Sequence, residues 1–422
     1  MSRPLPLRLL PNNDKTNPVA GQRAGPPTLL WEEMSMTSTR FVGAFAGVLF
    51  AATAAQAADP VKIGLILPFS GPFADYGRQI DNGIQLYLKQ NGDTVAGRKI
   101  ELIRKDSTGP APDIVKRLAQ ELVVRDKVDL LAGFGFTPNA FVGAQIATDA
   151  RKPMVVMNAA TSSITAKSPY VVRFSFTQAQ INEPFGAWAA RGGVQSVYTI
   201  VSDYGPGHDA EAAFKKGFTA AGGKVAGEVR VPLKSPEFSA YIQKVKDTKP
   251  EAVFVFLPAG EQGNAFVKTW REYGLPQAGV KLLAAGDLTD DGLIESLGDA
   301  ALGLITSFHY SYAHDSAVNK AYTAAYEQAF PQVRPNFMSV AGYDGMAAIA
   351  AAIKAQDGRV DPDKTVELLK TTKMESPRGP ISIDPETRDI VQTVYIRKVE
   401  RVGGKLVNVE FDKIEQVKDP GK

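Results

Sequence analysis

The chain has 422 residues, of which 44% are hydrophobic and 22% charged, the composition of a globular protein long enough for two domains. It contains no cysteine, which excludes disulfides, thiolate catalysis, cysteine-bearing zinc sites and a lipid anchor on an N-terminal cysteine. A net charge of +3 without a long basic run argues against a nucleic-acid partner.

The N-terminal residues are predicted to lie outside the fold. Residues 1–35 follow no hydrophobic period, and we interpret them as disordered or as an extension from a wrongly included upstream start codon. Residues 36–57 are typical of a signal peptide, with Arg40 before an apolar stretch and Ala55-Gln56-Ala57 as the cleavage site. The apolar stretch is about half as long as a membrane span, and a buried core helix is the alternative. We therefore expect a protein exported to the periplasm and not embedded in the membrane.

A β-turn-α unit opens the mature chain. Residues 61–67 form an apolar run typical of a strand buried on both faces, and Ile80, Ile84 and Leu88 then recur at helical spacing. The turn between them carries Ser70, Phe73 and Tyr76, which suits a pocket for a small organic molecule, because such pockets lie at the carboxyl ends of strands.

Strands and helices then alternate in two successive sets, which predicts two parallel sheets with right-handed crossovers. The first set has strands at 99–104, 128–132, 154–157 and 170–174 and helices at 111–124 and 139–150. The second has strands at 196–201, 224–231, 252–257, 280–283 and 303–307 and helices at 181–191, 206–221, 238–246, 260–273 and 288–297. A less regular third portion has helices at 316–330, 337–356 and 363–370, a loop at 376–380 and strands at 391–399 and 405–411.

Two turns of the first set are candidates for ligand binding. Gly133-Phe134-Gly135 follows a strand but lacks the third glycine of a dinucleotide fingerprint, so nucleotide binding is disfavoured. Thr137 begins the next helix, where its hydroxyl and nearby N–H groups suit a carboxylate; the alternative is that Thr137 only caps the helix. Ala159-Ala160-Thr161-Ser162 is small enough for a ligand to approach the main chain, or is a plain polar loop.

The second set offers Tyr204 and Asp287 at equivalent turns. Tyr204 either faces the crevice or is a surface tyrosine, and Asp287 is either an acid in the cleft or a surface cap of the following helix. The three histidines are not spaced as metal ligands, and neither G-x-S-x-G nor H-E-x-x-H occurs. The sequence thus predicts neither catalysis nor a metal or other cofactor.

Together the motifs resemble the type I periplasmic binding proteins of ABC importers, in the Leu/Ile/Val branch. The resemblance rests on Ser70-Gly71-Pro72-Phe73-Ala74-Asp75-Tyr76-Gly77, Asn158-Ala159-Ala160-Thr161, Ser202-Asp203-Tyr204-Gly205-Pro206-Gly207 and Gly379-Pro380-Ile381. It implies two Rossmann-like α/β lobes with parallel-sheet cores, joined by three hinge crossovers near 174–177, 308–311 and 392–395. The N-terminal lobe would comprise 58–175 and 310–391, and the C-terminal lobe 176–309 and 392–422.

The resemblance also implies roles for individual residues. Tyr76 would form a pocket wall, while Thr137 and the backbone at Phe136, Ala159 and Thr161 would bind a ligand carboxylate. Tyr204 would pack from the second lobe and Asp287 would hold an α-ammonium. The ligand-binding residues expected in full are Tyr76, Phe136, Thr137, Ala159, Ala160, Thr161, Tyr204, Pro258, Ala259 and Asp287.

Two departures from the family pattern leave the ligand open. The loop Phe136-Thr137-Pro138 has few hydroxyls, and Leu257-Pro258-Ala259-Gly260 lacks the tyrosine often found there. Both changes suit a larger, flatter acid, so an aliphatic amino acid and an aromatic carboxylate are both retained. The expected partners are this ligand and the permease subunits, with the protein itself a monomer. The alternative function is a ligand-sensing receptor module, and an enzyme on the same scaffold is disfavoured.

Overall fold

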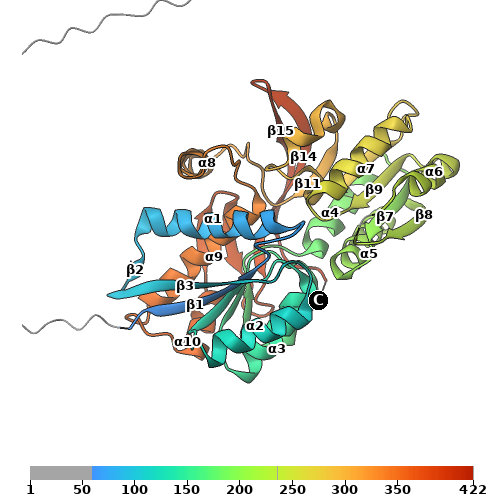
Figure 1. Ribbon diagram of the computed structural model, residues 1–422. Helices are drawn as coiled ribbons and strands as arrows, with labels where there is room; N and C mark the ends of the chain where they lie inside the picture. Colours follow the sequence, from blue (N-terminus) through green and yellow to red (C-terminus); the bar gives the residue numbers. More distant parts are fainter. Residues whose placement is uncertain (1–58, 235, 422) are drawn as a thin grey trace, which may run out of the picture. The chain divides into compact units, whose positions relative to one another are not determined.

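Two α/β lobes form the part of the chain that the computed structural model describes, residues 59–234 and 236–421 (Figure 1). These residues belong to one compact unit, Gln56–Lys422. The predicted upstream extension and signal peptide lie outside the described residues. Within those residues, no helix is both long and apolar enough to cross a membrane.

The first lobe is built on a six-stranded sheet in the order β2-β3-β1-β4-β5-β6. Its central strand β1 pairs in parallel with β3 and β4, and nearly all of its side chains are buried, as expected for an apolar strand covered on both faces. The strands are β1 (Val61–Leu67), β2 (Thr94–Val95), β3 (Arg98–Asp106), β4 (Leu130–Gly133), β5 (Met154–Val156) and β6 (Val171–Arg173).

Helices cover both faces of this sheet, with α1 and α9 on one side and α2 and α3 on the other (Figure 1). Helix α1 buries Ile80 and Ile84 at the predicted helical spacing. Three of the helices come from the third portion of the chain, which returns to this lobe. The helices are α1 (Ala74–Asn91), α2 (Pro112–Val124), α3 (Thr137–Asp149), α8 (Ala317–Ala329), α9 (Phe337–Lys354) and α10 (Pro362–Lys370), with a 3₁₀ helix η1 (Ser162–Lys167).

The second lobe contains a parallel run of five strands in the order β11-β10-β9-β7-β8, extended by antiparallel strands. Its parallel strands are β7 (Ser196–Ser202), β8 (Lys224–Val231), β9 (Ala252–Phe256), β10 (Lys281–Ala285) and β11 (Ile305–Phe308). Its helices are α4 (Gln178–Arg191), α5 (Gly205–Ala220), α6 (Ser239–Thr248) and α7 (Glu261–Glu272).

A long antiparallel strand connects the sheet of the second lobe to a hairpin that packs on the first. In β14 (Ile390–Val402), Ile390 and Val391 pair with β13 (Gly379–Ile383), whereas the stretch from Tyr395 to Lys398 pairs with β11. Ile381 and Ile390 belong to the hydrophobic core of the first lobe, and Ile396 to a core of the second. The strands completing this region are β12 (Lys373–Ser376) and β15 (Lys405–Val417).

The predicted helix at 288–297 is wrong. The segment instead forms two 3₁₀ helices, η2 (Gly286–Thr289) and η3 (Ile294–Ala301), because Asp290 interrupts it. Asp290 has a non-helical ψ of 128°, and its carboxylate accepts from Gly292 N–H at 2.9 Å, which stabilises a turn that competes with the helix.

The predicted loop at 376–380 is too long, because only residues 377–378 form the turn of a hairpin between β12 and β13. Ser376 and Gly379 pair at its end, and Pro380 pairs with Glu375 inside the ladder. Gly379 adopts a φ of +92°, which only glycine enters without strain. Glycine and proline therefore marked a tight turn here rather than an extended loop.

Candidate functional site

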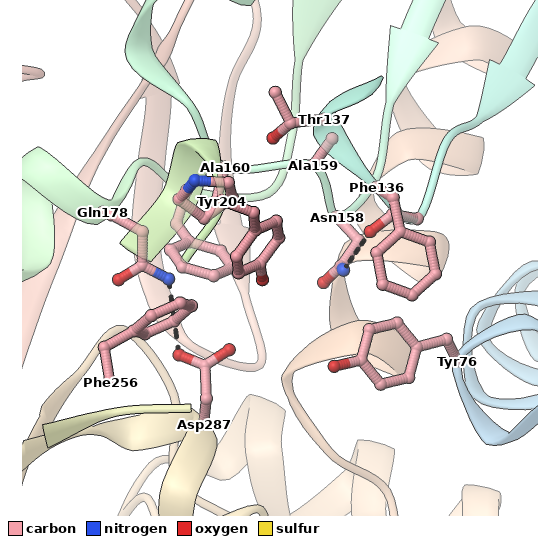
Figure 2. Close-up of a pocket in the computed structure, with 13 residues that line it drawn as sticks. Tyr76, Phe136, Thr137, Asn158, Ala159, Ala160, Gln178, Tyr204, Phe256 and Asp287 are labelled. Carbon is pink, nitrogen blue, oxygen red and sulfur yellow. Dashed lines mark hydrogen bonds between the residues drawn. The ribbon is translucent and has the colours of Figure 1, made fainter. Parts of the chain in front are cut away.

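A pocket lies where the carboxyl ends of strands from both lobes meet, and the space between its side chains, part of it open to solvent, is about 300 Å³ (Figure 2). Its walls are rich in aromatic rings, with a few hydroxyl, amide and carboxyl groups among them. The residues that line it are Tyr76, Gly135, Phe136, Thr137, Asn158, Ala159, Ala160, Phe176, Gln178, Tyr204, Pro206, Phe256 and Asp287.

The first lobe contributes a stacked pair of rings. Tyr76 lies in the first turn of α1 and Phe136 directly precedes α3; their centroids are 5.3 Å apart at an interplanar angle of 12°. Phe73 packs edge-on against both rings. Edge-on and offset-stacked contacts are the favourable geometries for aromatic pairs, so this wall is held rigidly in place.

The second lobe contributes a second pair. Tyr204 lies at the start of α5 and Phe256 ends β9, and their rings stack with centroids 6.1 Å apart. Phe176, from the segment that joins β6 to α4, adds a further aromatic surface. Burial raises the pKa of the Tyr204 and Tyr76 hydroxyls well above their ordinary value, so both phenols are neutral hydrogen-bonding groups.

Two helix N-termini meet at one end of the pocket. Helix α3 begins at Thr137, and α5 of the other lobe begins at Gly205. Gly205 is so close that a Cβ on it would lie 3.0 Å from the Thr161 hydroxyl oxygen. Because the first N–H groups of a helix have no partner within it and carry partial positive charge, this end favours an anion.

The alternative that Thr137 merely caps α3 is wrong. The N-cap position belongs to Phe136, and no side-chain cap is formed. The Thr137 hydroxyl instead donates to Thr161 Oγ1 at 3.1 Å, which links the helix start to the turn after β5.

A buried arginine, Arg173, stabilises the turn after β5. Arg173 Nη1 donates to the carbonyls of Ala159 and Thr161 at 3.0 and 2.8 Å, while its Nε pairs with Asp389 at 2.7 Å. Ala159 N–H donates to Phe134 O at 3.0 Å. Because both backbone groups of Ala159 are engaged, its expected contact with a ligand carboxylate through the main chain is not favoured, and its side chain faces the pocket instead.

Asp287 stands at the opposite end of the pocket from Thr137 (Figure 2). It belongs to η2, is only 7% exposed and receives a 3.5 Å hydrogen bond from Gln178 Nε2. Burial raises its pKa from 3.8 to about 7, although the Gln178 bond opposes this shift. The alternative of a surface aspartate capping a helix is therefore wrong, since Asp287 is buried and no α-helix follows it.

The comparisons with known proteins agree with this geometry. The model of a family described as "Periplasmic binding protein" matches residues 60–405. The chain belongs to this periplasmic binding protein family. Within it, the chain is 45% identical over 372 residues to the "Leu/Ile/Val-binding protein homolog 6" of Brucella abortus (strain 2308), covering 88% of this chain and 95% of the relative.

Two solved structures of periplasmic binding proteins are similar over 86% of this chain and 99% of their own. One is a solute-binding protein of an ABC transporter from Rhodopseudomonas palustris BisB5 in complex with 3,4-dihydroxybenzoic acid, at 54% identity and a TM-score of 0.83. The other, from Rhodopseudomonas palustris HaA2, is in complex with p-hydroxybenzoic acid, at 45% identity and a TM-score of 0.84. The chain is thus a solute-binding protein of the ABC-transporter type, in the Leu/Ile/Val-binding branch.

Most of the residues expected to bind ligand come together in this periplasmic binding protein's pocket, but three do not line it. Thr161 supports Thr137 from behind, and Pro258 is buried beyond the end of β9. The carbonyl of Ala259 accepts from the Tyr76 hydroxyl at 3.2 Å, which connects the lobes beside the pocket. The residues in the lining are Tyr76, Phe136, Thr137, Ala159, Ala160, Tyr204 and Asp287, and their contacts with a ligand stay predictions.

Six residues of the lining were not among the expected ligand-binding residues: Gly135, Asn158, Phe176, Gln178, Pro206 and Phe256. Phe256 ends a strand that was predicted to continue to Leu257, so the loop after it was favoured instead. Asn158 stood within a motif but was passed over in favour of its smaller neighbours. Phe176 and Gln178 lie in the crossover between the lobes, where no periodic pattern distinguishes residues that face the ligand.

Proposed function

We propose that this periplasmic binding protein captures a 4-hydroxylated aromatic carboxylate between its lobes and releases it unchanged. The observation that carries the proposal is the pair of aromatic walls, Tyr76 with Phe136 and Tyr204 with Phe256, on opposite sides of one pocket. A flat ring between such walls gains both burial and stacking contacts.

The ligand carboxylate would lie at the end formed by Thr137 and the starts of α3 and α5. Among the residues that the structure describes, no lysine or arginine lines the pocket, so the partial charge of the helix ends and the Thr137 hydroxyl are the groups that would compensate the anion. Closure would bring the second helix start to the carboxylate, which makes binding stronger in the closed state than in the open one.

The para-hydroxyl would lie at the opposite end, near Asp287 and Gln178. A hydroxyl both donates and accepts, so it suits a carboxyl group whose pKa is about 7 and an amide beside it. Asp287 would also suit the α-ammonium of a hydrophobic amino acid, which is the second candidate. The two aromatic-acid complexes among the similar structures favour the first.

From the family assignment we also propose the lobe boundaries, the export of the protein and its partner in transport. The lobes would be divided at 174–177, 308–311 and 392–395, with cleavage after Ala57 releasing a periplasmic monomer. That monomer would deliver its ligand to the permease subunits without chemical change. A permease gene beside this one would support transport, whereas a chemoreceptor gene would support the sensing alternative.

A thermal-shift and calorimetry screen of residues 58–422 tests the ligand assignment. The panel is 4-hydroxybenzoate, 3,4-dihydroxybenzoate, benzoate, leucine, isoleucine, valine and phenylalanine. We expect the hydroxybenzoates to raise the melting temperature as RT ln(1 + [L]/Kd) requires, and the ligand to be recovered unaltered. Stabilisation by the amino acids alone would overturn the aromatic assignment in favour of the second candidate.

A further inference from the structure

Asn158 presents a buried acceptor that has no partner within the described part of the chain. Its side chain is only 8% exposed and lines the pocket beside the Ala159-Ala160 turn. Its Nδ2 donates to Gly135 O at 2.8 Å, but its Oδ1 has no hydrogen-bond partner among the described residues. A buried acceptor without a donor is costly, and native structures rarely contain one without a reason.

The hydrogen bond to Gly135 fixes which way the amide points. Turning the amide over would place Oδ1 against the Gly135 carbonyl, and two acceptors cannot bond to each other. The free oxygen therefore faces the pocket interior, toward the space between Tyr204 and Tyr76 (Figure 2). It lies to one side of the line that runs from Thr137 to Asp287, rather than at either end.

We infer that Asn158 Oδ1 accepts a hydrogen bond from a second ring hydroxyl, so that the pocket selects 3,4-dihydroxylated over 4-monohydroxylated aromatic acids. The inference rests on the proposed function, which places the carboxylate at Thr137 and the 4-hydroxyl at Asp287. When the ligand occupies both ends, Asn158 on the side wall faces one edge of the ligand's aromatic ring. A hydroxyl at position 3 projects there, whereas one at position 2 lies next to the carboxylate.

Selectivity follows from the cost of leaving Oδ1 unsatisfied. A monohydroxylated acid seals the pocket and leaves the oxygen without a donor, whereas a 3-hydroxyl satisfies it. The expected preference is on the order of tenfold, the effect of one buried hydrogen bond. A 3-methoxy-4-hydroxy acid has an oxygen at the same place but no proton to donate, and it should lose this preference.

Calorimetry on the wild-type protein and on Asn158→Ala and Asn158→Leu provides the test. The measured quantity is the ratio of Kd for 4-hydroxybenzoate to Kd for 3,4-dihydroxybenzoate. We expect about ten in the wild type and close to one in both variants. Any loss of affinity caused by leaving the Gly135 carbonyl unpaired applies to both ligands and cancels in the ratio of their Kd values. Phe256→Leu, on the opposite wall, is the matched control and should weaken both ligands alike.

The possible outcomes separate this inference from the proposed function. A ratio near one in the wild type, or a ratio that Asn158→Ala leaves unchanged, overturns the role of Asn158 while leaving aromatic-acid binding intact. Equal affinity for the 3-methoxy and 3-hydroxy acids in the wild type overturns it without any variant, even if the variants do not fold. Failure of every aromatic acid to bind the wild type overturns both.

Discussion

At the scale of single residues, closure of the pocket is coupled to protonation of Asp287. We take the arrangement in the structure, where both lobes line one pocket, as the closed form; burial there raises the pKa of Asp287 from 3.8 to about 7. In an open cleft water would reach this carboxyl group, and its pKa would return toward the ordinary value. Between these two values the closed form carries a proton that the open form lacks, so closure takes up a proton from solution.

We therefore predict that binding of 4-hydroxybenzoate is accompanied by uptake of up to about one proton at pH 5.5, and that affinity falls as the pH rises from about 4 to 7. The direction follows because raising the pH removes the proton that the closed form prefers to keep. Calorimetry in two buffers of different ionisation enthalpy measures the number of protons directly.

Asp287→Asn is the control for that measurement. The variant has no titratable group at this position and should bind with no such uptake. Equal uptake in the variant, or proton release by the wild type, would contradict the assignment. A ligand that carries an ammonium would keep Asp287 ionised, so leucine should bind without uptake if it binds at all.

The sequence indicated only part of this site. Tyr76, Thr137, Tyr204 and Asp287 could be found because each follows directly after a strand, where a parallel sheet places its ligand. Asn158 could not be assigned, because its role depends on Gly135, which lies 23 residues away, and on which amide atom faces inward. Such contacts are set by tertiary packing and have no local signature.

At the scale of secondary-structure elements, the packing of α1 on α9 completes the first lobe. The two helices approach so closely that a Cβ on Gly83 would collide with the carbonyl oxygen of Ser339 in α9. Helix α9 is rich in alanine, and its capping box at Asn336 and Ser339 fixes where it begins. Small residues on both helices permit this contact.

We predict that Gly83→Ala destabilises the protein by about 1–3 kcal/mol, the usual cost of forcing extra volume into a packed contact. Alanine favours a helix more than glycine does, so a loss of stability would show that the steric effect outweighs propensity. Urea denaturation measures the change. Lys89→Ala, on the exposed side of α1, is the control and should change stability by less than about 0.5 kcal/mol. A stabilised Gly83→Ala variant would contradict the packing.

Most elements were predictable because hydrophobic residues follow recognisable strand and helix patterns that alternate along the chain. Strand β1 was predicted at its observed bounds, and α5 and α9 to within two residues at each end. The failures at η2, η3 and the β12–β13 turn share one cause. There a side chain or a glycine sets the backbone locally, and hydrophobic spacing carries no information about it.

At the scale of the whole molecule, Arg334 connects the lobes away from the ligand. It lies in the segment between α8 and α9, which pack on the first lobe. Its Nη2 pairs with Glu295 of η3 at 2.9 Å, and its Nη1 donates to Leu406 O of β15 at 2.8 Å. Both partners belong to the second lobe, so these contacts stabilise the closed arrangement without touching the pocket.

We predict that Arg334→Ala raises Kd by about tenfold for every ligand and leaves the ratios between ligands unchanged. The variant removes charge-assisted bonds between the lobes, which we expect to break when the lobes open, and affinity falls with the population of the closed state. Calorimetry with two hydroxybenzoates measures the change, and small-angle scattering should show a more open ligand-free form.

Arg151→Ala is the control, because the exposed Arg151–Asp363 pair lies within the first lobe. It should leave Kd and scattering unchanged. An effect of Arg334→Ala on one ligand but not another would contradict a role in closure alone.

The return of the chain to its first lobe has a consequence for synthesis on the ribosome. Strand β1 is made early, but α9, which covers α1, ends only at Lys354. At ordinary translation rates roughly 15–60 seconds separate the synthesis of β1 from that of α9. The first lobe therefore cannot complete its fold until α9 has been made. Nascent chains usually fold from their N-terminus onward, whereas this one holds an exposed apolar surface until synthesis is nearly finished. That delay would keep it unfolded, the state in which a secretion channel accepts a polypeptide.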